Sequence, residues 1–303
     1  MKRRALSLND IVAEYGQQRV LNGVDLRLDS GCTAIIGPNG AGKTTLFRVG
    51  AGVLEPTRGT VTIRGDDPFD NPAIKAEVGY VPHIPSLTSN LSVRRNLQFW
   101  GRVLDLTPEY VRERIDELAD SLEFHDLLSK DGGELSRGQS QRIAIARGLL
   151  SEPSILFLDE PTAGLDPSIR SNLLQLLRRL GTSDKTVLYA THNLHEANQL
   201  ADDVALLRDG TVVRSESRDE IIAEYSGRRL LQLKLASNEQ RSVIRELGYE
   251  PSIEGEYVQF EVEPDTTVTD VVEQLADLGV KVEDVRTDEN ALQHFFEGED
   301  RVK

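Results

Sequence analysis

Short apolar runs, bounded by glycine, proline or charged residues, recur along the first two thirds of the chain. Such runs are typical of strands buried on both faces of a mainly parallel sheet. Segments between the runs carry apolar residues three and four positions apart, which predicts helices. The alternation of the two patterns predicts an α/β core. The predicted core strands are Ala34–Gly37, Ser154–Asp159, Thr186–Thr191 and Asp203–Gly210.

Two segments depart from this alternation. Residues 17–31, QQRVLNGVDLRLDSG, alternate and turn in a way that predicts antiparallel strands beside the core. From about Leu91 to Leu150 the pattern is helical, and Thr107 followed by Pro108 predicts a helix start. We therefore expect an antiparallel β flank and a helical subdomain at about residues 86–150.

A different pattern begins after residue 226. Alternating apolar positions predict two half-buried strands, and two capping pairs predict helix starts. The order resembles β-α-β-β-α-β, so we predict domains at 1–226 and 227–303, with the second a small α+β unit of ferredoxin-like type. The strands are marked by Leu231, Leu233 and Leu235, by Val258, Phe260 and Val262, and by Val280–Val285; the helix starts are marked by Ser237 with Gln240 and by Thr267 with Asp270.

The composition restricts the classes of function. The 303 residues include 50 acidic and 35 basic side chains, which gives a formal net charge of −15. An acidic surface repels nucleic-acid phosphates, so broad nucleic-acid binding is not expected. The acidic excess is spread along the chain and arginine outnumbers lysine, which favours a halophilic, salt-rich cytoplasm over ordinary solubility.

Cysteine content and hydropathy indicate the compartment. Cys32 is the single cysteine of the sequence and precedes an apolar strand, which predicts a buried structural thiol in a reducing compartment. No apolar run approaches the ~18 residues of a membrane span. We therefore expect a chain in the cytoplasm, or one that sits on a membrane through a partner.

A glycine-rich segment, GPNGAGKT, lies between a predicted strand and a predicted helix. It fits G-x-x-x-x-G-K-[ST] in full, and this context predicts a phosphate-binding P-loop rather than a glycine-rich turn without a ligand. Its backbone N–H groups and the helix start face the phosphates. Lys43 is predicted to contact the β- and γ-phosphates, and Thr44 to ligate Mg²⁺. The predicted nucleotide-binding residues here are Gly37, Pro38, Asn39, Gly40, Ala41, Gly42, Lys43, Thr44 and Thr45.

Two adjacent carboxylates, Asp159 and Glu160, end the apolar run ILFLD. They lie at the carboxyl end of a predicted strand, where open α/β sheets bind ligands. Asp159 is predicted to contact Mg²⁺, and Glu160 to polarise a water for attack on the γ-phosphate. The apolar residues before them argue against the alternative of a solvated turn.

The segment LSRGQ, Leu135–Gln139, precedes the helix SQRIAIARGLL and lies upstream of the strand that ends in Asp159. It closely resembles the signature motif of ATP-binding-cassette (ABC) ATPases. TAGLD and the pair Thr191-His192 follow in the order of that family, and the resemblance covers about Ala5–Tyr225. The implied fold is a P-loop NTPase core.

The resemblance assigns further roles. It implies that His192 contacts the γ-phosphate and Glu160, so the expected catalytic residues are Glu160, His192 and Lys43. Tyr15 stands where the family stacks an aromatic ring on adenine; a surface tyrosine beside Gly16 is the alternative. The residues implied to contact ATP from a second copy of the chain are Ser136, Gly138 and Gln139, and Asp166 is the implied D-loop aspartate.

One position departs from the family pattern. After VGYVP the family usually carries a glutamine that touches Mg²⁺ and marks the loop coupling to the membrane partner, whereas this chain carries His83. Magnesium prefers oxygen ligands, so the imidazole is expected to coordinate poorly, and His83→Gln is expected to keep or raise ATPase activity. Because of its position in the sequence, His83 is still a candidate metal ligand, together with Thr44 and Asp159.

The resemblance implies the ATP-hydrolysing subunit of an ABC transporter, with ATP and Mg²⁺ as cofactors. Two chains would close head to tail around two ATP and drive a separate membrane permease, of exporter type by motif order. Homodimer and heterodimer both stay open. The resemblance also implies a cytoplasmic location, in which the permease holds the chain on the inner face of the membrane as a peripheral subunit. One alternative is a nucleic-acid-handling ATPase, against which the acidic surface and the lack of long heptad segments argue. Another is a soluble regulatory protein that binds ATP without hydrolysing it, against which Glu160 and His192 argue.

Overall fold

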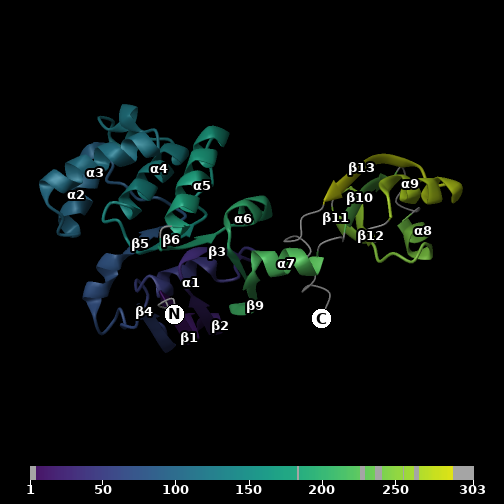
Figure 1. Ribbon diagram of the computed structural model, residues 1–303, viewed down its shortest axis with the longest axis horizontal. Coiled ribbons are helices and arrows are strands. Elements are labelled where there is room, and N and C mark those ends of the chain that lie inside the picture. The colour runs from purple at the N-terminus through teal and green to yellow at the C-terminus, as the bar shows by residue number, and fades with distance from the viewer. Residues whose placement is uncertain are drawn as a thin grey trace. The chain divides into compact units, whose positions relative to one another are not determined.

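The computed structural model describes residues 5–182, 184–225, 229–235, 241–254, 256–262 and 266–288. The chain divides into two compact units, Met1–Arg218 and Asp219–Lys303 (Figure 1). The division falls at the start of helix α7 (Arg218–Tyr225), earlier than the boundary after residue 226 that the sequence suggests. Each unit encloses its own cluster of buried apolar side chains.

The first unit is built on a six-stranded sheet with the order β5-β6-β7-β3-β8-β9. The first five strands are parallel, and β9 is antiparallel to β8. Every residue of β3, β6 and β7 is buried, as the continuous apolar runs predict. The predicted α/β class is confirmed. The strands are β3 (Gly31–Ile36), β5 (Val78–Val81), β6 (Ile155–Asp159), β7 (Thr186–Ala190), β8 (Asp203–Arg208) and β9 (Thr211–Ser217).

A three-stranded antiparallel sheet, β2-β1-β4, forms the expected β flank. The prediction of a turn within residues 17–31 is wrong: Gln18 to Leu28 form one strand. Val12 pairs with Asn22 and Ile11 with Val24, so the residue between, Gly23, is the extra residue of a β-bulge. The bulge breaks the alternation and imitates a turn. The strands are β1 (Leu6–Tyr15), β2 (Gln18–Leu28) and β4 (Arg58–Ile63).

Helix α1 (Lys43–Gly50) packs between the two sheets of the first unit. Its Leu46 and Phe47 join one apolar cluster with residues of β1, β2 and β4 and with residues of the parallel sheet. Phe47 meets Phe157 of β6 edge to face, with ring centroids 5.7 Å apart. This packing fixes the start of α1 against the end of β6. Helices α5 (Pro167–Gly181) and α6 (Leu194–Leu200) cover the other face of the sheet.

The helical subdomain consists of α2, α3 and α4, which pack on one another (Figure 1). Thr107 accepts a hydrogen bond from the Tyr110 N–H and Pro108 opens α3, so the predicted helix start is confirmed. The far end of α4 reaches the edge of the parallel sheet at β5. The helices are α2 (Val93–Val103), α3 (Pro108–Ser121) and α4 (Arg137–Gly148).

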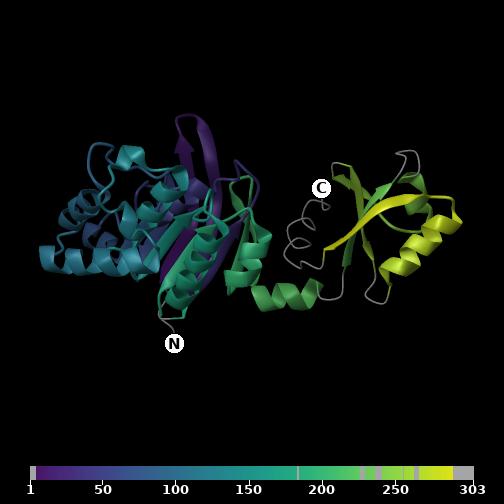
Figure 2. The same cartoon turned by 90° about the horizontal axis from the view of Figure 1, so that it is seen from above.

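After α7, the described residues of the second unit form a four-stranded antiparallel sheet with the order β11-β12-β10-β13 and the helices α8 and α9 (Figures 1 and 2). Apolar residues of α8 and α9 share one core with alternate residues of β10 and β12. The predicted capping pair Thr267 and Asp270 is confirmed; Ser237 and Gln240 lie outside the described residues. The elements are β10 (Arg229–Leu235), α8 (Arg241–Glu246), β11 (Ser252–Glu254), β12 (Tyr257–Val262), α9 (Val268–Asp277) and β13 (Val282–Asp288).

Candidate active site

The phosphate loop joins β3 to α1, and two of its glycines, Gly37 and Gly42, are sterically required. A Cβ atom at Gly37 would overlap the carbonyl oxygen of Leu207 in β8. Gly42, the N-cap of α1, has a φ of 106°, and a Cβ there would lie 2.9 Å from a methyl carbon of Leu21. Side chains would therefore displace the loop, and the glycines leave its backbone close to the helix start.

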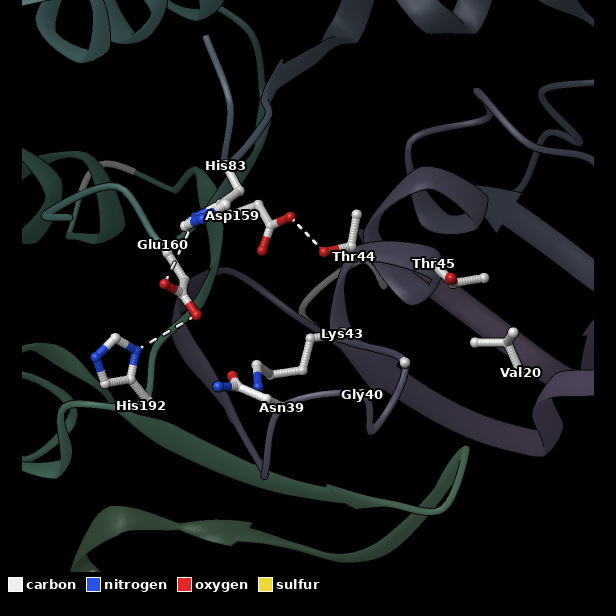
Figure 3. A pocket seen from close by; sticks show the side chains of 11 residues that line it. Val20, Asn39, Gly40, Lys43, Thr44, Thr45, His83, Asp159, Glu160 and His192 are labelled. Atoms are coloured by element: carbon white, nitrogen blue, oxygen red, sulfur yellow. Dashed lines mark hydrogen bonds and ion pairs between the residues drawn. The ribbon is translucent and has the colours of Figure 1, made fainter. Parts of the chain in front are cut away.

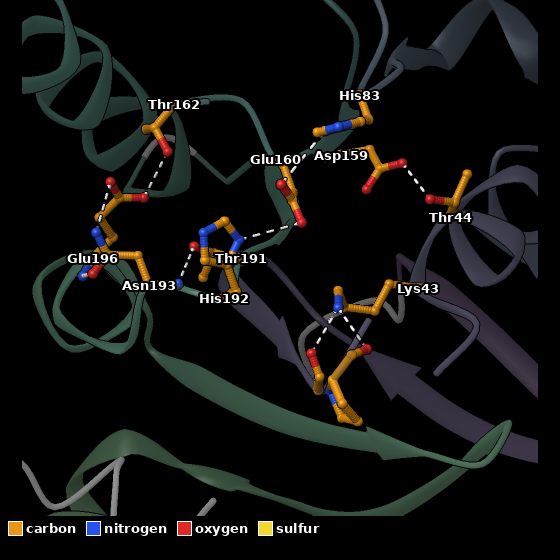
Figure 4. A network of polar contacts seen from close by, with 12 residues as sticks. Lys43, Thr44, His83, Asp159, Glu160, Thr162, Thr191, His192, Asn193 and Glu196 are labelled. Atoms are coloured by element: carbon orange, nitrogen blue, oxygen red, sulfur yellow. Dashed lines mark hydrogen bonds and ion pairs between the residues drawn. The ribbon is translucent and has the colours of Figure 1, made fainter. Parts of the chain in front are cut away.

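Lys43, the first residue of α1, closes the loop on itself. Its ammonium donates hydrogen bonds to the carbonyl oxygens of Gly37, at 2.6 Å, and Pro38, at 3.0 Å (Figure 4). Burial lowers the pKa of Lys43, while the nearby carboxylates of Glu160 and Asp159 oppose that shift. The ammonium is thus placed inside the loop that the sequence predicts to bind phosphate.

Asp159 ends β6 beside the start of α1. Its carboxylate accepts a 2.7 Å hydrogen bond from the Thr44 hydroxyl (Figure 3). The residue is 2% exposed, and burial raises its pKa above the usual range even though the Thr44 hydrogen bond acts in the opposite direction. The Thr44 hydroxyl and the Asp159 carboxylate, both of which can ligate a metal through oxygen, therefore lie together although they are 115 residues apart in sequence.

Glu160 lies between two imidazoles (Figures 3 and 4). Its Oε1 is 3.3 Å from Nδ1 of His192, and its Oε2 is 3.5 Å from Nδ1 of His83. The backbone of Glu160 is left-handed, with a φ of 51°, and its N–H donates to the carbonyl oxygen of Ala190. This turn directs the carboxylate away from the strand and toward the phosphate loop.

A cavity of about 510 Å³ connects these groups (Figure 3). Most of the predicted catalytic, metal and phosphate-loop residues line it. Val20 of β2 also lines it and was missed, because no motif marks an apolar residue of the flanking sheet. The lining residues are Val20, Asn39, Gly40, Gly42, Lys43, Thr44, Thr45, His83, Asp159, Glu160 and His192.

Several predicted residues do not line this cavity. Tyr15, at the end of β1, is 43% exposed, and its hydroxyl accepts a hydrogen bond from Arg48. Gly37, Pro38 and Ala41 belong to the loop but not to the lining. Ser136, Gly138, Gln139 and Asp166 lie at the starts of α4 and α5.

The start of α4 is held by a capping box. The Ser136 hydroxyl oxygen accepts from the Gln139 N–H, and the Gln139 side chain accepts from the Ser136 N–H. A Cβ at Gly138 would lie 2.5 Å from the carbonyl oxygen of Gly164, so the glycine allows α4 to approach the loop between β6 and α5. The motifs LSRGQ and TAGLD therefore pack together within one chain.

The cavity supplies some, but not all, of the ligands that a magnesium ion requires. The Thr44 hydroxyl and the Asp159 carboxylate are the oxygen donors that Mg²⁺ prefers, and phosphate oxygens and waters usually complete its shell. The described residues contain no cluster of three or more His, Cys, Asp and Glu side chains arranged for a metal. An imidazole such as His83 is a poor magnesium ligand.

Comparison with known proteins identifies the family. The ABC transporter family model matches residues 21–163. The chain is 36% identical to the daunorubicin resistance ATP-binding protein DrrA3 of Streptomyces coeruleorubidus over 76% of its length and 73% of that protein. This chain belongs to the ABC transporter ATP-binding proteins. The predicted family is confirmed, and the chain is an ABC ATPase.

Further comparisons agree with this assignment of the ABC ATPase. The Nod factor export ATP-binding protein I of Rhizobium sp. (strain N33) is 33% identical over 84% of this chain and 85% of that protein. An ATP-binding subunit of an ABC transporter matches with a TM-score of 0.68 and 29% identity, covering 73% of this chain and 93% of that structure. The dimeric cassette MJ0796 bound to ADP and Pi has a TM-score of 0.64 and 27% identity, covering 70% and 98%.

Among the described residues, none of the helices has the length and apolar character that crossing a membrane requires.

Proposed function

We propose that this ABC ATPase is the energy-coupling subunit of an exporter, in which two copies close around two ATP molecules and drive a separate membrane permease. The observation that carries the proposal is the position of Glu160. Its carboxylate is turned toward the cavity that Lys43, Thr44 and Asp159 also line, and His192 lies beside it. This is the arrangement of a base that faces a phosphate site.

In this proposal the phosphate loop and Lys43 bind the β- and γ-phosphates of ATP. Thr44 and Asp159 hold a magnesium ion, which neutralises phosphate charge when it is bound. Glu160 accepts a proton from the attacking water, and His192 orients Glu160 and the γ-phosphate. Tyr15, with its half-exposed ring, stacks on adenine.

The second copy is needed because part of the predicted ATP site lies elsewhere on the chain. Ser136, Gly138 and Gln139 do not line the cavity that contains Lys43. We assign them to ATP held by the partner, in a two-fold arrangement where the same patch serves both copies. The dimeric structures of the cassette MJ0796 support this arrangement.

The exporter assignment is based on the relatives. DrrA3 is named for daunorubicin resistance, and the protein from Rhizobium for Nod factor export. We therefore place this ATPase in the cytoplasm, on the inner face of the membrane through its permease. The second unit, whose strand order is that of a ferredoxin-like domain, is proposed as an accessory domain.

The test uses Glu160→Gln, with the exposed Glu55→Gln as the matched control. We expect the Glu160 variant to lose ATP hydrolysis by roughly 10²- to 10⁴-fold, because the base is removed. It should also elute as a dimer in gel filtration with ATP and Mg²⁺ but not with ADP. The control should behave as the native protein. Undiminished hydrolysis, or a monomer in ATP, would contradict the proposal.

A further inference from the structure

His83 lies between the loop that carries Glu160 and the start of helix α4. Its Nε2 is 3.3 Å from Nη2 of Arg137, the first residue of α4. Its Nδ1 is 3.5 Å from Oε2 of Glu160. That Nδ1 is buried and makes no hydrogen bond within the described part of the chain, so it is a buried polar atom directed at a carboxylate.

The two neighbours of His83 determine where its proton lies. A guanidinium has donors only, so Nε2 must be the acceptor in the contact with Arg137. A neutral imidazole then carries its proton on Nδ1, where the carboxylate of Glu160 is the available acceptor. Hydrogen bonds of this kind are often long before the nucleotide binds and shorten afterwards.

Helix α4 contacts the loop of His83 at a second point. The guanidinium of Arg147, near the end of α4, donates a 3.0 Å hydrogen bond to the carbonyl oxygen of Ser86 and lies 4.9 Å from the centre of the Trp100 ring of α2. Burial lowers the pKa of Arg147. The loop after β5 is therefore attached to the helical subdomain at both ends of α4.

We propose that His83 is a positioning residue for Glu160: its Nδ1–H holds the carboxylate, while Arg137 fixes its tautomer and ties it to α4. A movement of the helical subdomain would thereby also move the carboxylate of Glu160. This inference rests on the proposed role of Glu160. The proposal also excludes His83 as a magnesium ligand. Its two ring nitrogens face Arg137 and Glu160, and not a metal ion held by Thr44 and Asp159.

Kinetics of two substitutions test the role. Removing a side chain that orients a catalytic group usually costs about 10- to 100-fold in activity, and we expect that loss in kcat for His83→Ala. His83→Gln should keep the native kcat, because an amide has a donor for Glu160 and an acceptor for Arg137. Arg142→Ala, which removes a guanidinium from the same helix that bonds the Glu123 carbonyl oxygen, is the matched control and should keep native activity.

A second measurement needs no nucleotide. The ¹⁵N shifts of the five histidines, with His83 assigned by its loss in His83→Gln, should show the proton of His83 on Nδ1. Arg137→Ala should shift His83 toward a mixture of tautomers. A native Nε2–H tautomer, or a glutamine variant as slow as the alanine variant, would overturn the proposal.

The two hypotheses about this site can fail separately. If His83→Ala raises the Mg²⁺ concentration needed for half-maximal hydrolysis and leaves kcat unchanged, His83 is a metal residue and the positioning role is wrong, while the role of Glu160 stands. If Glu160→Gln hydrolyses ATP at the native rate, the proposed function itself is wrong, whatever the tautomer of His83.

Discussion

At the scale of single residues, three residues of the phosphate site are held in unfavourable states, namely Glu160, Asp159 and Lys43. Glu160 holds a left-handed backbone, which for a residue with a side chain costs of order 1–3 kcal/mol. Asp159 and Lys43 are both buried, and burial shifts the pKa of each toward its neutral form. Groups perturbed in this way are typical of sites that must act on a ligand rather than stabilise the fold.

Asp159→Asn should raise the thermal midpoint of the nucleotide-free protein at pH 7 and abolish hydrolysis. The folded pKa of Asp159 is raised, so its ionisation above that pKa opposes folding, and the neutral amide removes this penalty. The gain should vanish as the pH falls below the ordinary aspartate pKa of ~3.9, where the native carboxyl is protonated too. Scanning calorimetry at both pH values checks this.

The exposed Asp70→Asn is the control for that experiment and should leave the midpoint unchanged at either pH. A lower midpoint for Asp159→Asn at pH 7 would mean that the charged form of Asp159 is stabilising in the folded chain, against the direction of its pKa shift.

At the scale of elements, strands buried on both faces were predictable, whereas several other strands were not. The buried strands β3, β6, β7 and β8 match the apolar runs, because a strand covered on both faces has a pattern that depends little on context. The four-residue β5 and the three-residue β11 were not located, since so short a strand is defined by the neighbour that it pairs with. The bulge at Gly23 resembles a turn in the sequence, because only the pairing of β2 with β1 shows that the strand continues.

The motifs predicted which residues would meet at the site, but not how they touch. The spacing of the sequence gives no sign that Arg137 contacts His83, or that Gly138 packs on Gly164, because these contacts join separate elements. The position of Tyr15 outside the cavity lining was equally invisible.

A buried network connects the loop of His192 to the loop after Glu160 (Figure 4). Glu196 of α6 is 4% exposed and accepts a 2.8 Å hydrogen bond from the Thr162 hydroxyl and a 3.3 Å bond from the Asn193 amide. Asn193 in turn caps α6, and its N–H donates to the Thr191 hydroxyl. The two loops that flank the candidate base are therefore joined behind the site.

Glu196→Ala should destabilise the protein by about 2–3 kcal/mol, because it leaves the buried Thr162 hydroxyl and the partly buried Asn193 amide without their acceptor. Urea unfolding measures the change. Glu55→Ala, at an exposed position, is the control and should stay within about 0.5 kcal/mol of the native protein. A loss as small as that of the control would show that the network does not hold the loops.

At the scale of the whole molecule, each of the two compact units encloses a cluster of buried apolar side chains. The family model matches residues 21–163, which lie inside the first unit, and that unit contains the complete candidate site of one chain. The second unit encloses its own apolar cluster on one face of its sheet. The assignment to the ABC ATPases therefore depends on the first unit.

The net charge of −15 predicts a salt-dependent stability. Repulsion among acidic side chains opposes the compact state, and salt screens it, with a Debye length of about 3 Å at 1 M. We expect the thermal midpoint at pH 7 to rise between low and molar KCl. Near the sequence pI of about 4.9 the same salt increase should have a smaller effect. A midpoint at pH 7 that does not respond to salt would rule out adaptation to a salt-rich cytoplasm.

The cap of α4 has a consequence for the encounter of two chains. Ser136 uses its hydroxyl oxygen as an acceptor within the helix, so the hydroxyl proton is left to donate elsewhere. That oxygen is already immobilised before any triphosphate arrives. In the two-fold arrangement that we propose, less rotational entropy is lost when a second chain brings its nucleotide to this helix, because the donor is prearranged and not mobile.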